Sequence, residues 1–124
     1  MRFKKGEKII CKNAQYSELK IGKIYTVEKQ EGDFVHCKEL EAGYFDFCFE
    51  HLADYLFEKL GYKKYETKEN IKYIFEGADT IVFNKKKKTV KTYIWNDGAR
   101  ELAKTLNKKE LQAINKKVLE LGWL

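Results

Sequence analysis

The chain has 124 residues, of which 44% are hydrophobic and 15% aromatic. This composition excludes an intrinsically disordered chain, because such chains are polar and poor in aromatic residues. The formal net charge is +6, and all of the excess lies in residues 53–124, which hold sixteen Lys/Arg against ten Asp/Glu, whereas residues 1–52 hold nine of each. The asymmetry predicts two modules, the second of which favours an anionic partner. A lysine-rich surface without such a partner would produce the same charge, and both interpretations stay open.

Targeting and redox features are few. No run of residues is apolar and long enough for a signal peptide or a membrane span. Three cysteines, an odd number without paired spacing, are typical of a reducing compartment. We therefore expect a cytoplasmic protein that has no membrane partner.

The first half contains short runs of alternating residues that are separated by turn signals. Strands are expected at residues 8–12, 24–30, 34–40 and 44–47, and a short helical turn is expected at residues 48–52. Strands of this length with a turn about every ten residues predict a small β-barrel over residues 1–52.

Four segments of this half carry a resemblance. They are KKGEKIIC (4–11), LKIGKIYTV (19–27), GDFVHC (32–37) and GYFDFCFE (43–50). In this order, and with these glycine positions, they resemble the Src-homology-3-like barrels of many small bacteriophage and prophage proteins. The resemblance covers about 45 residues and implies a generic binding or packing unit without a particular activity.

The second half begins with a predicted helix at residues 53–60. Leu56, Phe57 and Leu60 form its apolar side, and Gly61 is placed as a C-terminal cap. A short edge strand is expected next, at residues 63–66.

Three runs rich in β-branched and aromatic residues follow, at 71–77, 78–84 and 89–95. They predict an antiparallel three-stranded meander in which Lys85–Lys88 forms the second turn. Residues 99–106 are expected to be a loop or a short helical turn.

The last element is a predicted helix. Asn107 followed three residues later by Glu110 is a capping-box pattern, and apolar residues then recur at helical spacing until Gly122. The chain is therefore expected to have an α+β fold, with a small N-terminal β-barrel at 1–52 and an α-β-β-β-α module at 53–124 that contains an antiparallel three-stranded sheet flanked by helices.

The two ends of this second module carry another resemblance. LGYKKYE (60–66) and KELQAINKKVLELGWL (109–124) are similar to the beginning and end of another small phage-encoded module, which closes with Glu-Leu-Gly-Trp, here residues 120–123. The similarity implies the order helix, antiparallel strands, helix, and it implies no settled activity.

One face of the meander is a candidate binding surface, because lysines and aromatic residues alternate onto it. Aromatic rings can stack on bases while lysines contact phosphates, and each stacked base contributes about 1–3 kcal/mol. The predicted nucleic-acid- or partner-binding residues are Lys72, Lys85, Lys86, Lys87, Lys88, Lys91, Tyr93 and Trp95. The alternatives are a solvated lysine turn that discourages edge aggregation and aromatic rings that belong to the core.

Catalytic residues are not indicated by the sequence. Ser17 is the only serine, and neither His36 nor His51 has a nucleophile or carboxylate at the spacing of a known catalytic motif. We therefore predict no catalytic residue, no cofactor and no metal ion.

Two metal-binding alternatives remain. Acidic residues at the turns (Glu76, Asp79 and Asp97) could hold Mg²⁺ in a nuclease, although acids at turns are more often solvated turn formers. Cys11, Cys37, Cys48 and His51 could form a zinc site, but they lack two close pairs, and Cys11 and Cys37 alternate onto strand faces as buried thiols would.

Together these patterns predict a non-enzymatic accessory protein of phage or prophage type. It would bind a macromolecular partner, either nucleic acid or a host protein, through the basic surface of its second module. One alternative is a protein inhibitor of a host enzyme that handles nucleic acid or acts in defence, in the manner of anti-CRISPR proteins. A metal-dependent nuclease is the third.

Overall fold

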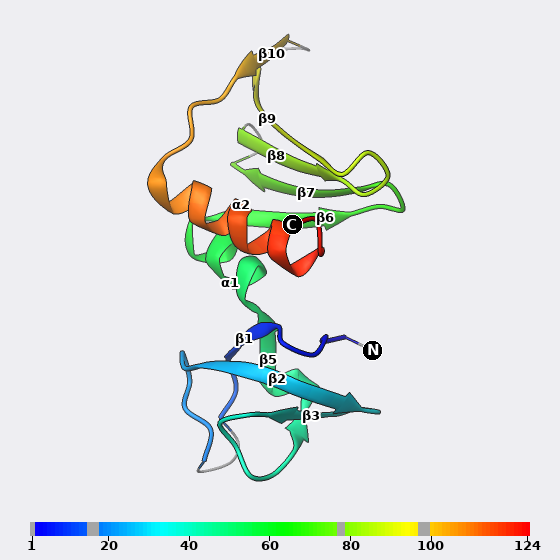
Figure 1. The fold of residues 1–124 in the computed structure, drawn as a ribbon. Coiled ribbons are helices and arrows are strands. Elements are labelled where there is room, and N and C mark those ends of the chain that lie inside the picture. Colours follow the sequence, from blue (N-terminus) through cyan, green and yellow to red (C-terminus); the bar gives the residue numbers. More distant parts are fainter. Residues whose placement is uncertain (1, 15–17, 77–78, 97–99) are drawn as a thin grey trace. The chain divides into compact units, whose positions relative to one another are not determined.

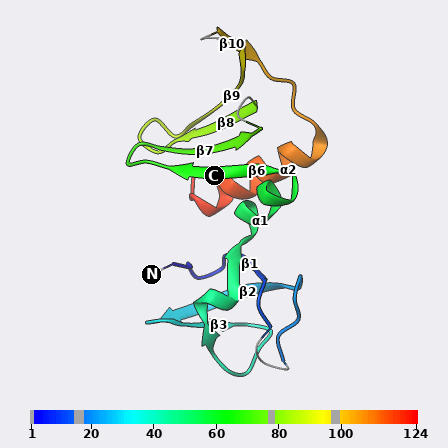
Figure 2. The same cartoon turned by 180° about the vertical axis from the view of Figure 1, so that it is seen from behind.

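A computed structural model describes the backbone of residues 2–14, 18–76, 79–96 and 100–124, without the side chains of residues 95, 96 and 100–103. The chain divides into two compact units, Met1–Tyr55 and Leu56–Leu124, and each contains one antiparallel sheet (Figures 1 and 2). The predicted α+β class is confirmed.

The elements are β1 (Lys8–Cys11), β2 (Ile24–Glu31), β3 (Phe34–Cys37), β4 (Tyr44–Phe45), the 3-10 helix η1 (Asp46–Cys48), β5 (Phe49–His51), α1 (Leu52–Lys59), β6 (Tyr62–Glu66), β7 (Asn70–Phe75), β8 (Asp79–Asn84), β9 (Thr89–Asn96), β10 (Arg100–Ala103) and α2 (Lys108–Glu120).

The first sheet has the strand order β4-β3-β2-β1-β5. Within the described residues no ladder joins the edge strands β4 and β5, so the expected closed barrel is not confirmed. Strand β4 has only two residues, and η1 follows it at once, which leaves little backbone for a further ladder. The helical turn expected at 48–52 is wrong in position, because η1 precedes it and β5 occupies residues 49–51.

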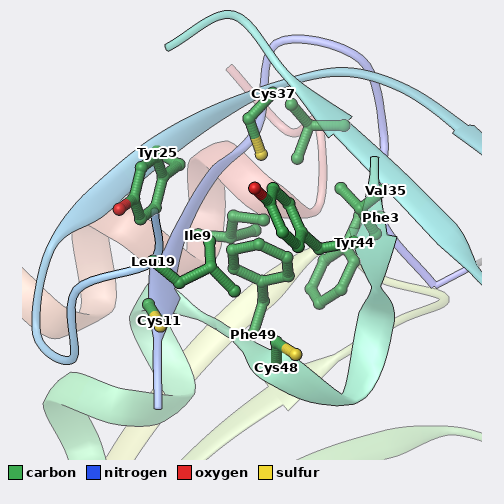
Figure 3. Packing of buried hydrophobic residues seen from close by; sticks show 11 residues of the cluster. Phe3, Ile9, Cys11, Leu19, Tyr25, Val35, Cys37, Tyr44, Cys48 and Phe49 are labelled. Atoms are coloured by element: carbon green, nitrogen blue, oxygen red, sulfur yellow. The ribbon is translucent and has the colours of Figure 1, made fainter. Parts of the chain in front are cut away.

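The core of the first unit lies on one side of this sheet. The buried cluster is formed by Phe3, Ile9, Cys11, Leu19, Tyr25, Val27, Val35, Cys37, Tyr44, Cys48 and Phe49. Figure 3 shows the rings of Tyr44 and Phe49 near the centre of the cluster and the three thiols around them. The alternation of the strands produces this arrangement, because every second side chain points to the same face.

The second sheet has five strands in the order β10-β9-β8-β7-β6. The predicted meander corresponds to β7, β8 and β9, and the predicted edge strand corresponds to β6. The loop or helical turn expected at 99–106 is wrong for residues 100–103, which form β10 and pair with Tyr93–Asn96. The physical reason is that the open edge of β9 offers backbone groups with which residues 100–103 can pair, and local sequence patterns do not show such a pairing.

Helices cover one face of the second sheet, and α2 crosses it beside β6 (Figures 1 and 2). The Phe57 ring of α1 stacks on Tyr73 of β7 with ring centroids 3.9 Å apart, and both rings are fully buried. Ala113 of α2 is buried in the same cluster. Helical periodicity on one side and strand alternation on the other therefore build one apolar layer between helices and sheet.

Helix α2 begins and ends close to the residues that the sequence predicts. Asn107 accepts a hydrogen bond from the Glu110 backbone N–H, and the Glu110 side chain accepts one from the Asn107 N–H, so the predicted capping box is confirmed. At the other end Gly122 has φ 73°, which favours glycine, and the Trp123 N–H donates to the Val118 carbonyl at 3.2 Å.

Among the described residues, no helix has the length and apolar character needed to cross a membrane.

Candidate nucleic-acid interface

The face of the second sheet opposite the helices is called here the outer face. Because directly paired residues of antiparallel strands point to the same side, the strand register defines its rows. The first row is Tyr65, Lys72, Val82 and Lys91; the second is Lys63, Ile74, Thr80 and Tyr93; the third is Asn70, Asn84 and Thr89. None of these residues is acidic.

Three of the predicted binding residues, Lys72, Lys91 and Tyr93, lie together on this face. Lys63 and Lys91 are exposed, and Lys72 is half-buried. Neither Lys63 nor Lys72 forms an ion pair with any residue that the structure describes. The charges of Lys63 and Lys72 are therefore not cancelled by a neighbouring carboxylate, which makes the face attractive to an anion.

The aromatic residues of the outer face differ in accessibility. Tyr93 is only 8% exposed, and the Lys91 Nζ lies 5.4 Å from the centroid of its ring. Stacking of a base on Tyr93 would therefore require a rearrangement. The side chain of Trp95 lies outside the described residues. Tyr65, in contrast, is 52% exposed.

Sequence reasoning missed Tyr65 and Lys63. The segment YKKYE at residues 62–66 contains the necessary pattern, because Lys63 and Tyr65 alternate with Tyr62 and Lys64, whose partners in β7 are Phe75 and Tyr73 on the helix side. The pattern shows only which residues share a face. That this face carries Lys72 and Lys91 became visible only through the register of β6 with β7.

The lysine turn at residues 85–88 is a well-defined structure next to the third row. The Asn84 side-chain oxygen accepts hydrogen bonds from the Lys86 N–H at 3.1 Å and the Lys87 N–H at 2.8 Å. Lys88 has φ 55°, a left-handed conformation that is uncommon outside glycine. The turn therefore presents Lys86, Lys87 and Lys88 as exposed cations at the end of the sheet.

Lys85 is different from the other lysines of this turn. Its Nζ lies 2.7 Å from the Glu66 carboxylate and donates to the Thr67 carbonyl at 3.0 Å. The hydrogen bond from Lys85 holds the pKa of the Glu66 carboxyl below its usual value. Lys85 is thus already engaged within the chain by an ion pair and a hydrogen bond.

A buried polar network lies on the helix side of the same sheet, around the start of α2. Lys104 Nζ lies 2.9 Å from Glu110 Oε2 and 3.2 Å from Asp79 Oδ2, and the Tyr62 hydroxyl donates to Glu110 Oε2. The side chains of Lys104 and Glu110 are each 7% exposed. Buried charges of this kind need such partners, because an isolated charge in the interior is costly.

The network shifts the pKa values of its members. Burial and the hydrogen bond to Glu110 raise the pKa of the Tyr62 phenol. Burial alone would lower the pKa of Lys104 and raise that of Glu110. The hydrogen bonds within the network outweigh burial, so the pKa of Lys104 is raised and that of Glu110 is lowered. All three groups are thereby held in their ordinary neutral-pH forms, which is the behaviour of a structural clamp rather than of a poised acid or base.

Two of the three acidic residues considered for Mg²⁺ lie among the described residues, and they have different surroundings. Asp79 belongs to the network with Lys104, and Glu76 is exposed at a turn with φ 49°. Asp97 lies outside the described residues. The ion pair between Asp79 and Lys104 therefore does not favour the nuclease alternative.

Three of the four residues considered for zinc belong to the buried core of the first unit, and the fourth has another partner. Cys11, Cys37 and Cys48 are buried free thiols, and burial raises the pKa of Cys37 to about 12. His51 Nδ1 pairs with the Glu7 carboxylate instead. Buried, protonated thiols are poor metal ligands and pack as small apolar groups.

Comparisons of this chain with protein-family models, curated proteins and solved structures give no match.

Proposed function

We propose that the chain is a non-enzymatic accessory protein of phage or prophage type that binds nucleic acid through the outer face of its second unit. The observation that carries the proposal is the composition of this face: three cross-strand rows contain Lys63, Lys72 and Lys91 and no acidic residue. The resemblances of both halves to small phage-encoded modules support the biological setting.

Electrostatics explains why such a face suits a polyanion. Each lysine that contacts a phosphate releases a counterion from the nucleic acid, so affinity falls steeply as the salt concentration rises. Lys86, Lys87 and Lys88 extend the cationic surface beyond the third row, where a backbone that crosses the sheet would leave it. Binding through phosphates needs no catalytic group.

The test is the salt dependence of binding to labelled nucleic acid. The logarithm of the affinity should fall linearly with the logarithm of salt concentration, with a slope of about 0.7–0.9 per phosphate contact. The triple variant Lys63→Gln, Lys72→Gln, Lys91→Gln should reduce this slope by about 2. A matched variant with Lys5→Gln, Lys12→Gln and Lys38→Gln, which are exposed lysines of the first unit, carries the same charge change and should keep the slope.

The proposal is wrong if the wild-type chain shows no salt-dependent binding, or if both triple variants lose affinity equally. Equal losses would mean that net charge alone attracts the nucleic acid and that the outer face has no special part.

A protein inhibitor of a host nucleic-acid-handling or defence enzyme is the second candidate, and an aromatic surface of the first unit favours it. Phe34 and Phe47 are each 43% exposed, and both rings contact Phe45, with centroid distances of 4.6 and 5.4 Å. Exposed aromatic clusters are frequent at the centres of protein interfaces.

The two candidates respond differently to nuclease treatment. An enzyme held through the aromatic surface should stay bound to the wild-type chain after nuclease digestion and should be lost from a Phe34→Ala, Phe47→Ala variant. A nucleic-acid-mediated association should disappear after digestion and should be insensitive to these two substitutions.

A further inference from the structure

Tyr65 gives the outer face a feature that phosphate binding alone does not need. We propose that Tyr65 is a base-stacking residue and that the outer face therefore selects single-stranded nucleic acid. The proposal rests on the proposed function, because it names the class of nucleic acid that the same site takes.

The position of Tyr65 in the sheet makes its ring accessible. Strand β6 is an edge strand, so among the described residues no strand lies beside Tyr65 on the side away from β7. The side chain is 52% exposed, whereas Tyr93 in the second row is 8% exposed. Within the three rows, Tyr65 is thus the ring that can accept a base without rearrangement.

Lysines lie on two sides of this ring. Lys72 is the direct cross-strand partner of Tyr65, at a typical Cα separation of about 5 Å. Lys63 precedes Tyr65 by two residues on the same face, about 6.8 Å along the strand. A base on the ring would therefore have its flanking phosphates within reach of two ammonium groups, and no carboxylate of the rows would repel them.

This arrangement discriminates between single and double strands. The faces of the bases in a duplex are already stacked on their neighbours, so stacking on Tyr65 would require a base to be unstacked and unpaired. An exposed single strand offers its base faces without that cost, and aromatic stacking accepts every base because each has a π face. The lysines contact either form, so the ring decides the preference.

The experiment measures binding of the full chain to three labelled probes of equal length. They are an oligodeoxythymidine of about 20 nucleotides, which exceeds the roughly 4–16 nucleotides that small single-strand-binding folds cover, a duplex, and an abasic strand that keeps the phosphates. Wild type should bind the oligodeoxythymidine most tightly. Tyr65→Ala should weaken that binding about 5- to 150-fold, with little change in the salt slope or in the binding of the abasic strand.

Two substitutions serve as controls at the same position. Tyr65→Phe keeps the ring and should bind like wild type, whereas Tyr65→Leu keeps apolar bulk without a flat ring and should resemble Tyr65→Ala. Because the side chain is half exposed, none of the three should unfold the chain, and thermal unfolding of each variant checks this.

The outcomes separate this inference from the proposed function. If wild type binds all probes with the expected salt dependence but prefers the duplex, binds the abasic strand as tightly as the oligodeoxythymidine, or is unaffected by Tyr65→Ala, the stacking inference is overturned and the phosphate-binding face remains. If wild type binds none of the probes, the proposed function itself fails, and the inference fails with it.

Discussion

The two sheets have the same number of strands and an antiparallel pattern, but they differ in where their acids lie relative to their lysines. In the first sheet Lys8 Nζ donates to the Thr26 hydroxyl at 2.6 Å, and the same hydroxyl donates to the Glu39 carboxylate at 2.9 Å. Lys29 lies 2.6 Å from Glu31 in the same sheet. In the second sheet, the rows that carry Lys63, Lys72 and Lys91 contain no acid.

The difference shows that the placement of acids, more than the number of lysines, makes a basic surface. The second unit keeps its acids too, but Glu110 and Asp79 neutralise Lys104 below the sheet, and Glu66 neutralises Lys85 at the turn. The three rows are left without an acid because these carboxylates pair elsewhere. Each prediction below tests one part of this contrast.

The largest loss of stability is expected from a substitution in the core that supports the outer face. Phe57→Ala should lower the free energy of unfolding of the second unit by about 3–5 kcal/mol, because Phe57 is fully buried and stacks on Tyr73. Both tryptophans of the chain, Trp95 and Trp123, lie in this unit. Tryptophan fluorescence during urea unfolding therefore reports on it directly. A matched Phe49→Ala variant removes a fully buried ring from the first unit. An unchanged fluorescence midpoint in Phe57→Ala would contradict the packing described here.

The buried network should give the next largest effect. Glu110→Ala removes the carboxylate that pairs with Lys104 and accepts the Tyr62 hydroxyl, so it should cost about 3 kcal/mol. Asn107→Ala removes only the cap of α2 and should cost about 1 kcal/mol. The same fluorescence measurement compares the two. If both variants lose the same small amount, the network contributes little beyond the capping box.

The pH dependence follows from the directions of the pKa shifts. The pKa of Glu110 is lowered in the folded chain. Its contribution to the free energy of unfolding is therefore complete above the pKa of about 4.3 that it has in the unfolded chain, and it is lost as the pH falls through the folded pKa. The pKa values of Lys104 and Tyr62 are raised in the folded chain. Their contributions to the free energy of unfolding are therefore complete below the pKa values of about 10 in the unfolded chain, and they are lost as the pH rises through the folded pKa values. The stability difference between wild type and Glu110→Gln should thus be largest near neutral pH and should shrink in acid. A difference that stays constant from pH 7 to acid would refute this account.

Local patterns predicted the parts of the fold whose causes are local. Asn107 and Glu110 lie three residues apart, so the capping box and the start of α2 could be read directly, and alternation located the meander and the faces on which Lys72 and Lys91 lie. What could not be read depends on distant partners. Strand β10 forms because β9 offers it an edge, and Glu110 meets Tyr62 from 48 residues away. Alternation also cannot tell how much of a ring is covered. The sequence therefore pointed to Tyr93, which is 8% exposed, and not to Tyr65, which is 52% exposed.

The smallest effects are expected in the lysine turn, where substitutions of Lys85 and Lys87 should have different consequences. Lys85→Gln should change stability by no more than about 1 kcal/mol, because its ion pair with Glu66 is partly exposed to solvent. It should also reduce the salt slope of nucleic-acid binding less than Lys87→Gln, since the Lys85 ammonium must leave Glu66 before it can contact a phosphate. Glu66→Gln should then raise affinity, because it releases Lys85 and removes a negative charge from the edge of the cationic surface. If Lys85→Gln and Lys87→Gln reduce the slope equally while Glu66→Gln has no effect, the acids at the edge of the surface do not control its charge, and the contrast between the two sheets loses its explanation.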